Sequence, residues 1–163
     1  YVENPGARIN IGKPIDTAAY RLPVYRNPAE AYDGSEQQKK YPLYHYCERT
    51  RWHLHTQYNH VPWLRELDPE PYLRMHPTDA EARGIAEGDY VEAYNDRGHC
   101  VCKVKFDMGV RPGMVASPKG WPREFYVAGS YQELTNDYVN TFHQNTSFDD
   151  TLVEVRKYEG EVK

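Results

Sequence analysis

The stretch YVEAYNDRGHCVCKVKF, residues 90 to 106, contains two alternating segments separated by a tight turn. In YVEAY (90 to 94) and CVCKVKF (100 to 106), alternate side chains fall on opposite faces if the backbone is extended, which is typical of strands bordering a core. The four residues NDRG between them (95 to 98) have the composition of a hairpin turn. The stretch therefore predicts a β-hairpin, and it explains the C-x-C motif most simply as a strand pattern.

Short strand-like runs and turns continue on both sides of this hairpin. We expect further strands at residues 39 to 47, 72 to 77, 114 to 117 and 151 to 158, and one helical turn within residues 61 to 67. The sequence Thr78-Asp79-Ala80-Glu81 predicts a capping box at the start of a short helix, which Gly84 ends. Together these elements predict a mainly β, barrel-like domain over residues 41 to 163.

Residues 1 to 40 are rich in Pro, Gly, Asn and charged residues and follow neither a helical nor a strand period. We expect them to form an extended N-terminal arm or interdomain linker. Because the chain starts with Tyr1 rather than Met, we also expect it to be a piece of a longer polypeptide.

The composition restricts the classes of partner. Hydrophobic residues make up 39% of the chain, mean hydropathy is −0.89, and aromatic residues include 15 tyrosines and 3 tryptophans. Many aromatic and few aliphatic side chains indicate a domain that also buries surface against another body. The formal net charge of −4 argues against binding nucleic acid or a membrane surface through bulk charge. No apolar run approaches the length of a membrane span, so we expect no direct membrane insertion.

The sequence RTRWHLHTQYNH, residues 49 to 60, places two arginines and three histidines in a net acidic chain. One interpretation is a metal site, because His53 and His55 would share a face on a strand, although no zinc-ligand spacing accompanies them. A second is an anion site, because the guanidinium groups of Arg49 and Arg51 suit phosphate oxygens. A third is a solvated loop. Local chemistry supports the anion site and the solvated loop equally.

The three cysteines, Cys47, Cys100 and Cys102, are an odd number and do not match a disulfide framework. Cys47 lies near His45 in the sequence, which could indicate a thiolate with a general base. Residues two apart on a strand are not thereby hydrogen-bonded, so we favour a structural role for Cys47.

A series of short motifs follows in order along the chain. It starts with Cys47-x-Arg49-x-x-x-His53-x-His55-Thr56-Gln57 and continues through Asn59, Trp63-Leu64-Arg65-Glu66, Pro69-Glu70-Pro71, His76-Pro77-x-Asp79-Ala80, Arg83-Gly84-Ile85, Gly88-Asp89-x-Val91, Asn95-Asp96-Arg97-Gly98, Arg111-Pro112-Gly113, Gly120-Trp121, Leu134-Thr135 and Leu152-Val153-Glu154-Val155. This ordered set resembles the C-terminal domain of prokaryotic molybdopterin oxidoreductases, the dimethyl sulfoxide reductase superfamily. Two positions depart from that pattern: Cys47 replaces the usual Thr or Ser, and Gln132 replaces the usual Asn.

The resemblance implies a six-stranded double-psi β-barrel with short helices. It also implies a bis-molybdopterin guanine dinucleotide cofactor with Mo or W, of which this domain would hold the pterin and pyrophosphate of one dinucleotide. The implied cofactor-binding residues are Arg49, Thr50, His53, His55, Thr56, Gln57, Gly120, Trp121, Thr135, Asn136 and Asp137. We expect no catalytic or metal-ligating residue here, because the metal ligand and iron–sulfur cysteines of that family lie in earlier domains.

The resemblance further implies a parent enzyme that moves an oxygen atom or a hydride equivalent, in either the periplasm or the cytoplasm. Its implied partners are the remaining domains of the catalytic subunit and an iron–sulfur electron-transfer subunit, and the isolated domain should be inactive. One alternative is a separate small subunit similar to that of formylmethanofuran dehydrogenase. Another is a non-catalytic interaction module whose histidine-rich loop is solvated or binds zinc. A pyruvoyl decarboxylase shares this barrel type, but the Gly129-Ser130 pair supports it poorly.

Overall fold

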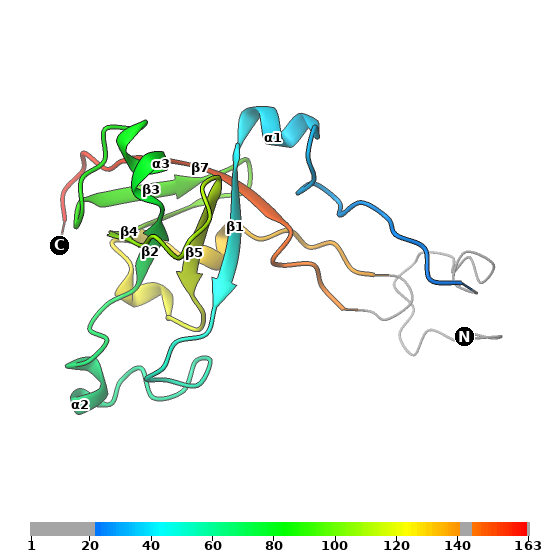
Figure 1. Ribbon diagram of the computed structural model, residues 1–163. Coiled ribbons are helices and arrows are strands. Elements are labelled where there is room, and N and C mark those ends of the chain that lie inside the picture. Colours follow the sequence, from blue (N-terminus) through cyan, green and yellow to red (C-terminus); the bar gives the residue numbers. More distant parts are fainter. Residues whose placement is uncertain (1–21, 141–144, 163) are drawn as a thin grey trace.

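The computed structural model describes residues 22 to 140 and 145 to 162 (Figure 1). Residues 1 to 21 of the expected arm lie outside this part. The elements are α1 (Glu36–Lys40), β1 (Leu43–Glu48), α2 (Pro62–Arg65), β2 (Tyr72–Met75), α3 (Pro77–Glu81), β3 (Tyr90–Tyr94), β4 (His99–Phe106), β5 (Met114–Pro118), η2 (Arg123–Phe125), β6 (Ala128–Gly129), η3 (Tyr131–Glu133) and β7 (Thr151–Lys157). None of the helices in the described ranges is long and apolar enough to cross a membrane.

Six of the strands form a closed ring. The order is β2-β5-β1-β7-β3-β4, and a parallel pairing of β4 with β2 closes it, while β6 attaches to the edge of β4. The neighbours β1 and β5 are also parallel, and the remaining pairs in the ring are antiparallel. The expected mainly β fold with a six-stranded barrel is confirmed.

The barrel interior is built from alternating aliphatic positions on successive strands. Leu73 and Met75 on β2, Val91 on β3 and Val115 on β5 are completely buried, as is Val153 on β7. Side chains two apart on a strand share a face, so each strand contributes one row to a common core. Burying an aliphatic side chain of this size stabilises the fold by roughly 1.5–3 kcal/mol.

The hairpin predicted from residues 90 to 106 is present. Strands β3 and β4 pair in antiparallel register from Tyr94 with His99 outward, and the Asn95 amide N–H donates to the carbonyl oxygen of Gly98. Cys100 and Cys102 are both buried and free, so the C-x-C motif is part of the core packing.

Three local predictions were wrong. The helix α3 is capped by His76, whose Nδ1 accepts from the Thr78 amide, because Pro77 already occupies the first helical turn. The first strand begins at Leu43 rather than at residue 39, since residues 36 to 40 form α1 behind a Ser35 cap. No strand was expected between residues 117 and 151, but Ala128–Gly129 forms β6, so Gly129 lies in a strand.

The segment before α1 contacts the barrel. The Glu30 carboxylate pairs with both terminal nitrogens of Arg97, at 2.7 and 2.8 Å, and also accepts from the Leu152 amide of β7. Ala31 and Ser35 are buried beside these contacts. Residues 30 to 35 are therefore fixed to the β3–β4 turn and to β7.

Candidate functional site

The histidine-rich loop, residues 49 to 60, begins where β1 ends. Because β1 and β5 are parallel, with Tyr44 opposite Met114 and Glu48 opposite Pro118, both strands end on the same side of the barrel. The loop therefore meets the residues that follow β5. Figure 1 shows this loop and α2 at the end of β1 opposite to α1.

The two chain segments touch through their backbones. The Asn59 side-chain amide donates to the Gly120 carbonyl oxygen at 2.7 Å, and both residues are buried. Gly120 has φ +93°, and a Cβ at this position would lie only 1.9 Å from the His55 carbonyl oxygen. Glycine is required here both by the backbone conformation and by the close approach.

The His53 side chain lies beneath the loop. Only 3% of it is exposed, and its Nδ1 donates to the His55 carbonyl oxygen at 3.0 Å. Its Nε2 lies 3.6 Å from the Asp68 carboxylate, and the ring packs edge-on against Trp121 at 5.2 Å between centroids. Among the implied cofactor-binding residues, His53 and Trp121 thus support the loop from inside.

The outer surface of the loop presents nitrogen and oxygen donors. Arg49, His55, Thr56 and Gln57 are all exposed, and Arg49 Nη1 lies 3.3 Å from His55 Nε2. Leu54 and Gln57 exchange backbone hydrogen bonds of 3.3 and 2.9 Å, which closes a tight turn around residues 55 and 56. The structure therefore brings four implied residues onto one exposed turn.

The backbone of this turn is unusual. His55 has φ +52° and Tyr58 has φ +74°, and they are the described non-glycine residues with positive φ. Such conformations are uncommon for bulky residues and cluster at functional sites. Thr50 Oγ1 donates to the His53 carbonyl oxygen at 3.3 Å, so its hydroxyl stabilises the loop internally.

The charge of the loop is not neutralised locally. Within residues 22 to 140 and 145 to 162, neither Arg49 nor Arg51 has a carboxylate partner, and Arg51 lies over the ring of Trp52. Two guanidinium groups without a carboxylate partner are suited to an anionic ligand.

The metal and thiolate interpretations receive no support. The rings of His53 and His55 point to different partners, and the part of the chain described here contains no group of three ligand residues for a metal ion. Burial, followed by the charge of Asp149, raises the pKa of Cys47 to about 12, so its thiol stays protonated at neutral pH.

Residues 135 to 137, here called the late loop, make hydrogen bonds mostly within their own part of the chain. The Asn136 side-chain amide donates to the carbonyl oxygens of Ser147 and Asp150, and the Thr135 hydroxyl donates to the Gln132 carbonyl oxygen. Asp137 is exposed. In the described ranges no hydrogen bond or ion pair joins residues 135 to 137 to the histidine-rich loop.

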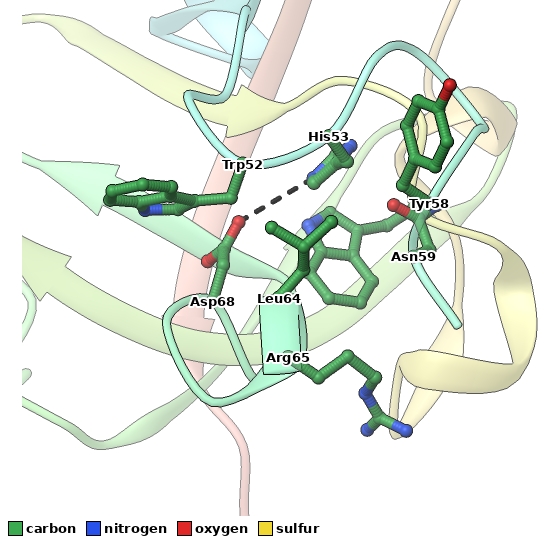
Figure 2. Close-up of a pocket in the computed structure, with 8 residues that line it drawn as sticks. Trp52, His53, Tyr58, Asn59, Leu64, Arg65 and Asp68 are labelled. Carbon is green, nitrogen blue, oxygen red and sulfur yellow. Dashed lines mark ion pairs between the residues drawn. The ribbon is translucent and has the colours of Figure 1, made fainter. Parts of the chain in front are cut away.

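A narrow pocket lies behind the histidine-rich loop, and Figure 2 shows His53 directed across it toward Asp68. Its wall includes Asn59, Leu64 and Asp68, which are not among the implied site residues. Asn59 belongs to the motif series. No sequence motif marks Asp68 as a site residue, because it reaches the pocket only through the turn that follows α2.

Comparison with known proteins identifies the family. The family described as "Molydopterin dinucleotide binding domain" matches residues 43 to 152, which is more than half of the chain. The chain belongs to this family. The matched range starts at the first residue of β1 and ends within β7, so it includes β1 to β6, the start of β7 and the histidine-rich loop.

Relatives of this molybdopterin dinucleotide-binding domain are much longer. A dimethyl sulfoxide/trimethylamine N-oxide reductase from Rhodobacter capsulatus is 35% identical over 152 residues, covering 85% of this chain and 18% of the relative. The dimethyl sulfoxide reductase DmsA from Haemophilus influenzae is 36% identical over 109 residues, covering 64% of this chain and 13% of the relative. The chain thus spans less than a fifth of either protein.

The barrel also matches a solved structure. Acetylene hydratase from Pelobacter acetylenicus superposes with a TM-score of 0.73 and 20% identity, over 84% of this chain and 21% of that chain. At this identity the likeness shows the fold alone, and it agrees with the closed ring described above. The molybdopterin dinucleotide-binding domain of the dimethyl sulfoxide reductase family therefore has the architecture that the sequence implied.

Proposed function

We propose that this domain holds the pyrophosphate and adjoining pterin of one molybdopterin guanine dinucleotide through the exposed turn of the histidine-rich loop. Arg49 contributes a guanidinium fork, His55 a ring N–H, Thr56 a hydroxyl and Gln57 an amide. When bound in the parent enzyme, the cofactor supplies the two-electron redox chemistry of its Mo or W centre.

One observation carries this proposal. The exposed donors of His55, Thr56 and Gln57, with Arg49 beside His55, gather at a turn whose backbone rests directly on Gly120, with no side chain between. Charge-assisted hydrogen bonds to phosphate are strongest when the donors are held in place beforehand. The turn offers such donors because Leu54 and Gln57 close it and His53 supports it from inside.

We infer different roles for the other implied residues. His53, Trp121 and Thr50 keep the loop in its binding shape, while Gly120 allows the approach. Thr135, Asn136 and Asp137 would meet a different portion of the cofactor, since their loop follows η3 rather than β1. Of these, Asp137 has the most exposed side chain and is our candidate for contact with the guanine end.

The parent enzyme, in this proposal, reduces an S-oxide or N-oxide. This rests on the names of two of the reductases that match the chain. The remaining domains of the catalytic subunit would supply the metal ligand and the second half of the cofactor site, and an iron–sulfur subunit would deliver electrons. The isolated chain accordingly holds half of a clamp and should not turn over substrate.

The test is an amide-resolved NMR titration of the chain with guanosine diphosphate. We expect shifts in residues 49 to 57 and 119 to 121, and about tenfold or greater weakening in Arg49→Ala, because a charged hydrogen bond contributes about 1.5–3 kcal/mol. Arg111→Ala is the matched control. This exposed arginine precedes Met114, at the opposite end of β5, and should leave the titration unchanged.

Shifts spread evenly over the surface, or an equal effect of both arginine variants, would contradict the proposed site. Adenosine diphosphate provides a second comparison. The pyrophosphate is common to both nucleotides, so shifts in residues 49 to 57 should persist with either one, whereas shifts that need guanine should locate the base-binding residues.

A further inference from the structure

The histidine-rich loop is supported from below by a buried pair of ionisable side chains. His53 and Asp68 are 3% and 7% exposed, and their facing atoms, Nε2 and Oδ2, lie 3.6 Å apart without any other hydrogen-bond partner in the described residues. Figure 2 shows the two side chains directed toward each other across the pocket. A buried polar atom left without a partner is unfavourable by about 1–3 kcal/mol, so this arrangement requires a stabilising contact.

The other side of the His53 ring determines where its protons are. Nδ1 lies 3.0 Å from the His55 carbonyl oxygen, and a carbonyl can only accept. Nδ1 must therefore carry a hydrogen. In a neutral ring Nε2 would then present a lone pair to the Asp68 carboxylate, and the two would repel.

We propose that His53 and Asp68 are positioning residues that share one proton between Nε2 and Oδ2, and that this pair fixes the His55 carbonyl and hence the binding turn. With the shared proton, the pair is either imidazolium with carboxylate or imidazole with carboxylic acid. Both forms replace repulsion with a hydrogen bond after a small side-chain adjustment. The role of the turn in this statement rests on the proposed function.

The geometry shows why the carbonyl of His55 is the point of control. It accepts from His53 on one side and abuts the Gly120 backbone on the other, while the residue itself is held at φ +52°. Left-handed conformations of non-glycine residues persist only where surrounding contacts impose them. If His53 turned away, this constraint would be lost, and the side chain of His55 would no longer be directed toward Arg49.

Charged groups on neighbouring elements act on the pair from several sides. Burial raises the pKa of Asp68, and the charges of Lys105 and His53 oppose that shift. The groups around the pair are Lys105 on β4, Tyr72 on β2, Glu48 on β1 and Arg65 on α2. Glu48 is paired with Arg74 at 2.6 Å. Burial outweighs the opposing charges at Asp68, so this carboxylate retains a proton more readily than an exposed one, as a shared proton requires.

The test compares the full chain with its Asp68→Asn variant by NMR, recording ring nitrogen and loop amide shifts from about pH 5 to about pH 8, where imidazoles titrate. In the unaltered chain, Nδ1 should stay protonated, and loss of the shared proton should move Nε2 and the amides of residues 53 to 58 in one common step. In the Asp68→Asn variant, the introduced side-chain amide would donate to a neutral His53, so this step should disappear while the loop keeps its shape.

Two further variants separate positioning from general destabilisation. Asp68→Ala should speed amide hydrogen exchange in residues 53 to 59 severalfold, and Asp68→Asn should restore protection. Glu159→Gln, which alters an exposed carboxylate after β7, should change neither measurement. If Asp68→Ala does not fold, the pH profile of Asp68→Asn alone tests whether His53 and Asp68 share a proton. An unchanged pH step in that variant, or an unprotonated Nδ1 in the unaltered chain, overturns the proposal.

These measurements need no bound nucleotide. A negative guanosine diphosphate titration would therefore refute the proposed function, while the pH profile and the hydrogen exchange would still test the proton-sharing pair. Conversely, nucleotide binding with no common pH step would refute the pair alone.

Discussion

The carbonyl oxygen of His55 lies only 1.9 Å from the position that a Cβ on Gly120 would occupy. The histidine-rich loop and the segment after β5 are thus joined backbone to backbone, and the shape of the proposed binding turn depends on one missing side chain.

Gly120→Ala should consequently disrupt the site more than an ordinary glycine substitution. Gly88→Ala is the matched control, since Gly88 also has a positive φ, +80°, but a Cβ added to it would meet nothing within 4 Å. The control should lose about 1–2 kcal/mol from backbone strain alone. The Gly120 variant should lose at least about 2 kcal/mol more, as in overpacked cores. Equal losses in urea denaturation would contradict the close approach.

His45 should make the fold sensitive to acid. Burial lowers its pKa from 6.5 to about 4, and its Nε2 lies 2.9 Å from the Ser117 hydroxyl. Between these two values the unfolded chain binds the proton more readily, so stability falls as pH decreases through this window, by up to about 3 kcal/mol. Above pH 6.5 the contribution of His45 to the free energy of unfolding is constant.

The measurement is the free energy of unfolding as a function of pH in the unaltered chain and in His45→Asn. Carboxylates contribute to acid unfolding in both proteins, so the difference between the two curves isolates His45. A difference that stays constant from neutral pH to about pH 4 would show that the imidazole is not held neutral.

The Cys47 thiol should react slowly with thiol reagents in the folded chain. Its pKa near 12 leaves almost no thiolate at neutral pH, and its backbone N–H donates to the Asp149 carboxylate at 3.0 Å. Labelling of the folded chain by a thiol reagent should be slow, and urea should expose all three cysteines. Cys47→Ser should change stability by less than about 1 kcal/mol. Rapid native labelling that this variant abolishes would restore the nucleophile interpretation.

Glu30 should be required to attach the segment before α1. It receives two hydrogen bonds from Arg97 and one from the Leu152 amide, so Glu30→Ala should reduce stability by about 1–3 kcal/mol. Glu36→Ala provides the control, because its pair with Lys39 is exposed and should contribute less than about 1 kcal/mol. Faster proteolysis near residue 30 should accompany the loss in the first variant and be absent from the second.

Much of the barrel could be predicted because its strands follow a period that the sequence displays directly. In the hairpin at residues 90 to 106, β3 alternates buried with partly buried positions and a clear turn follows it. The last strand, β7, contains Thr151, Val153 and Val155, whose β-branched side chains favour strands. The two-residue strand β6 escaped this reasoning, since Ala128 and Gly129 are too few to show any period. The cap of α3 was misplaced because Thr78 matched a capping pattern, whereas Pro77 already indicated a start one residue earlier.

The candidate site was harder to predict for a different reason. His53 and His55 would share a face on a regular strand, but the positive φ of His55 turns one ring inward and leaves the other exposed. Nothing in a linear pattern signals a left-handed histidine. Asp68 likewise has no local mark, because the pair that it forms with His53 exists only after α2 has folded back.

The position of β7 in the ring has a consequence for synthesis of the protein. This last strand pairs with β1 on one side and β3 on the other, so the barrel cannot close until residues 151 to 157 have left the ribosome. Pairings between such distant segments fold slowly and leave strand edges open in the meantime. A ribosome that stalls before Thr151 would therefore hold a nascent chain in which β1, and the loop that continues from it, is exposed to chaperones and proteases.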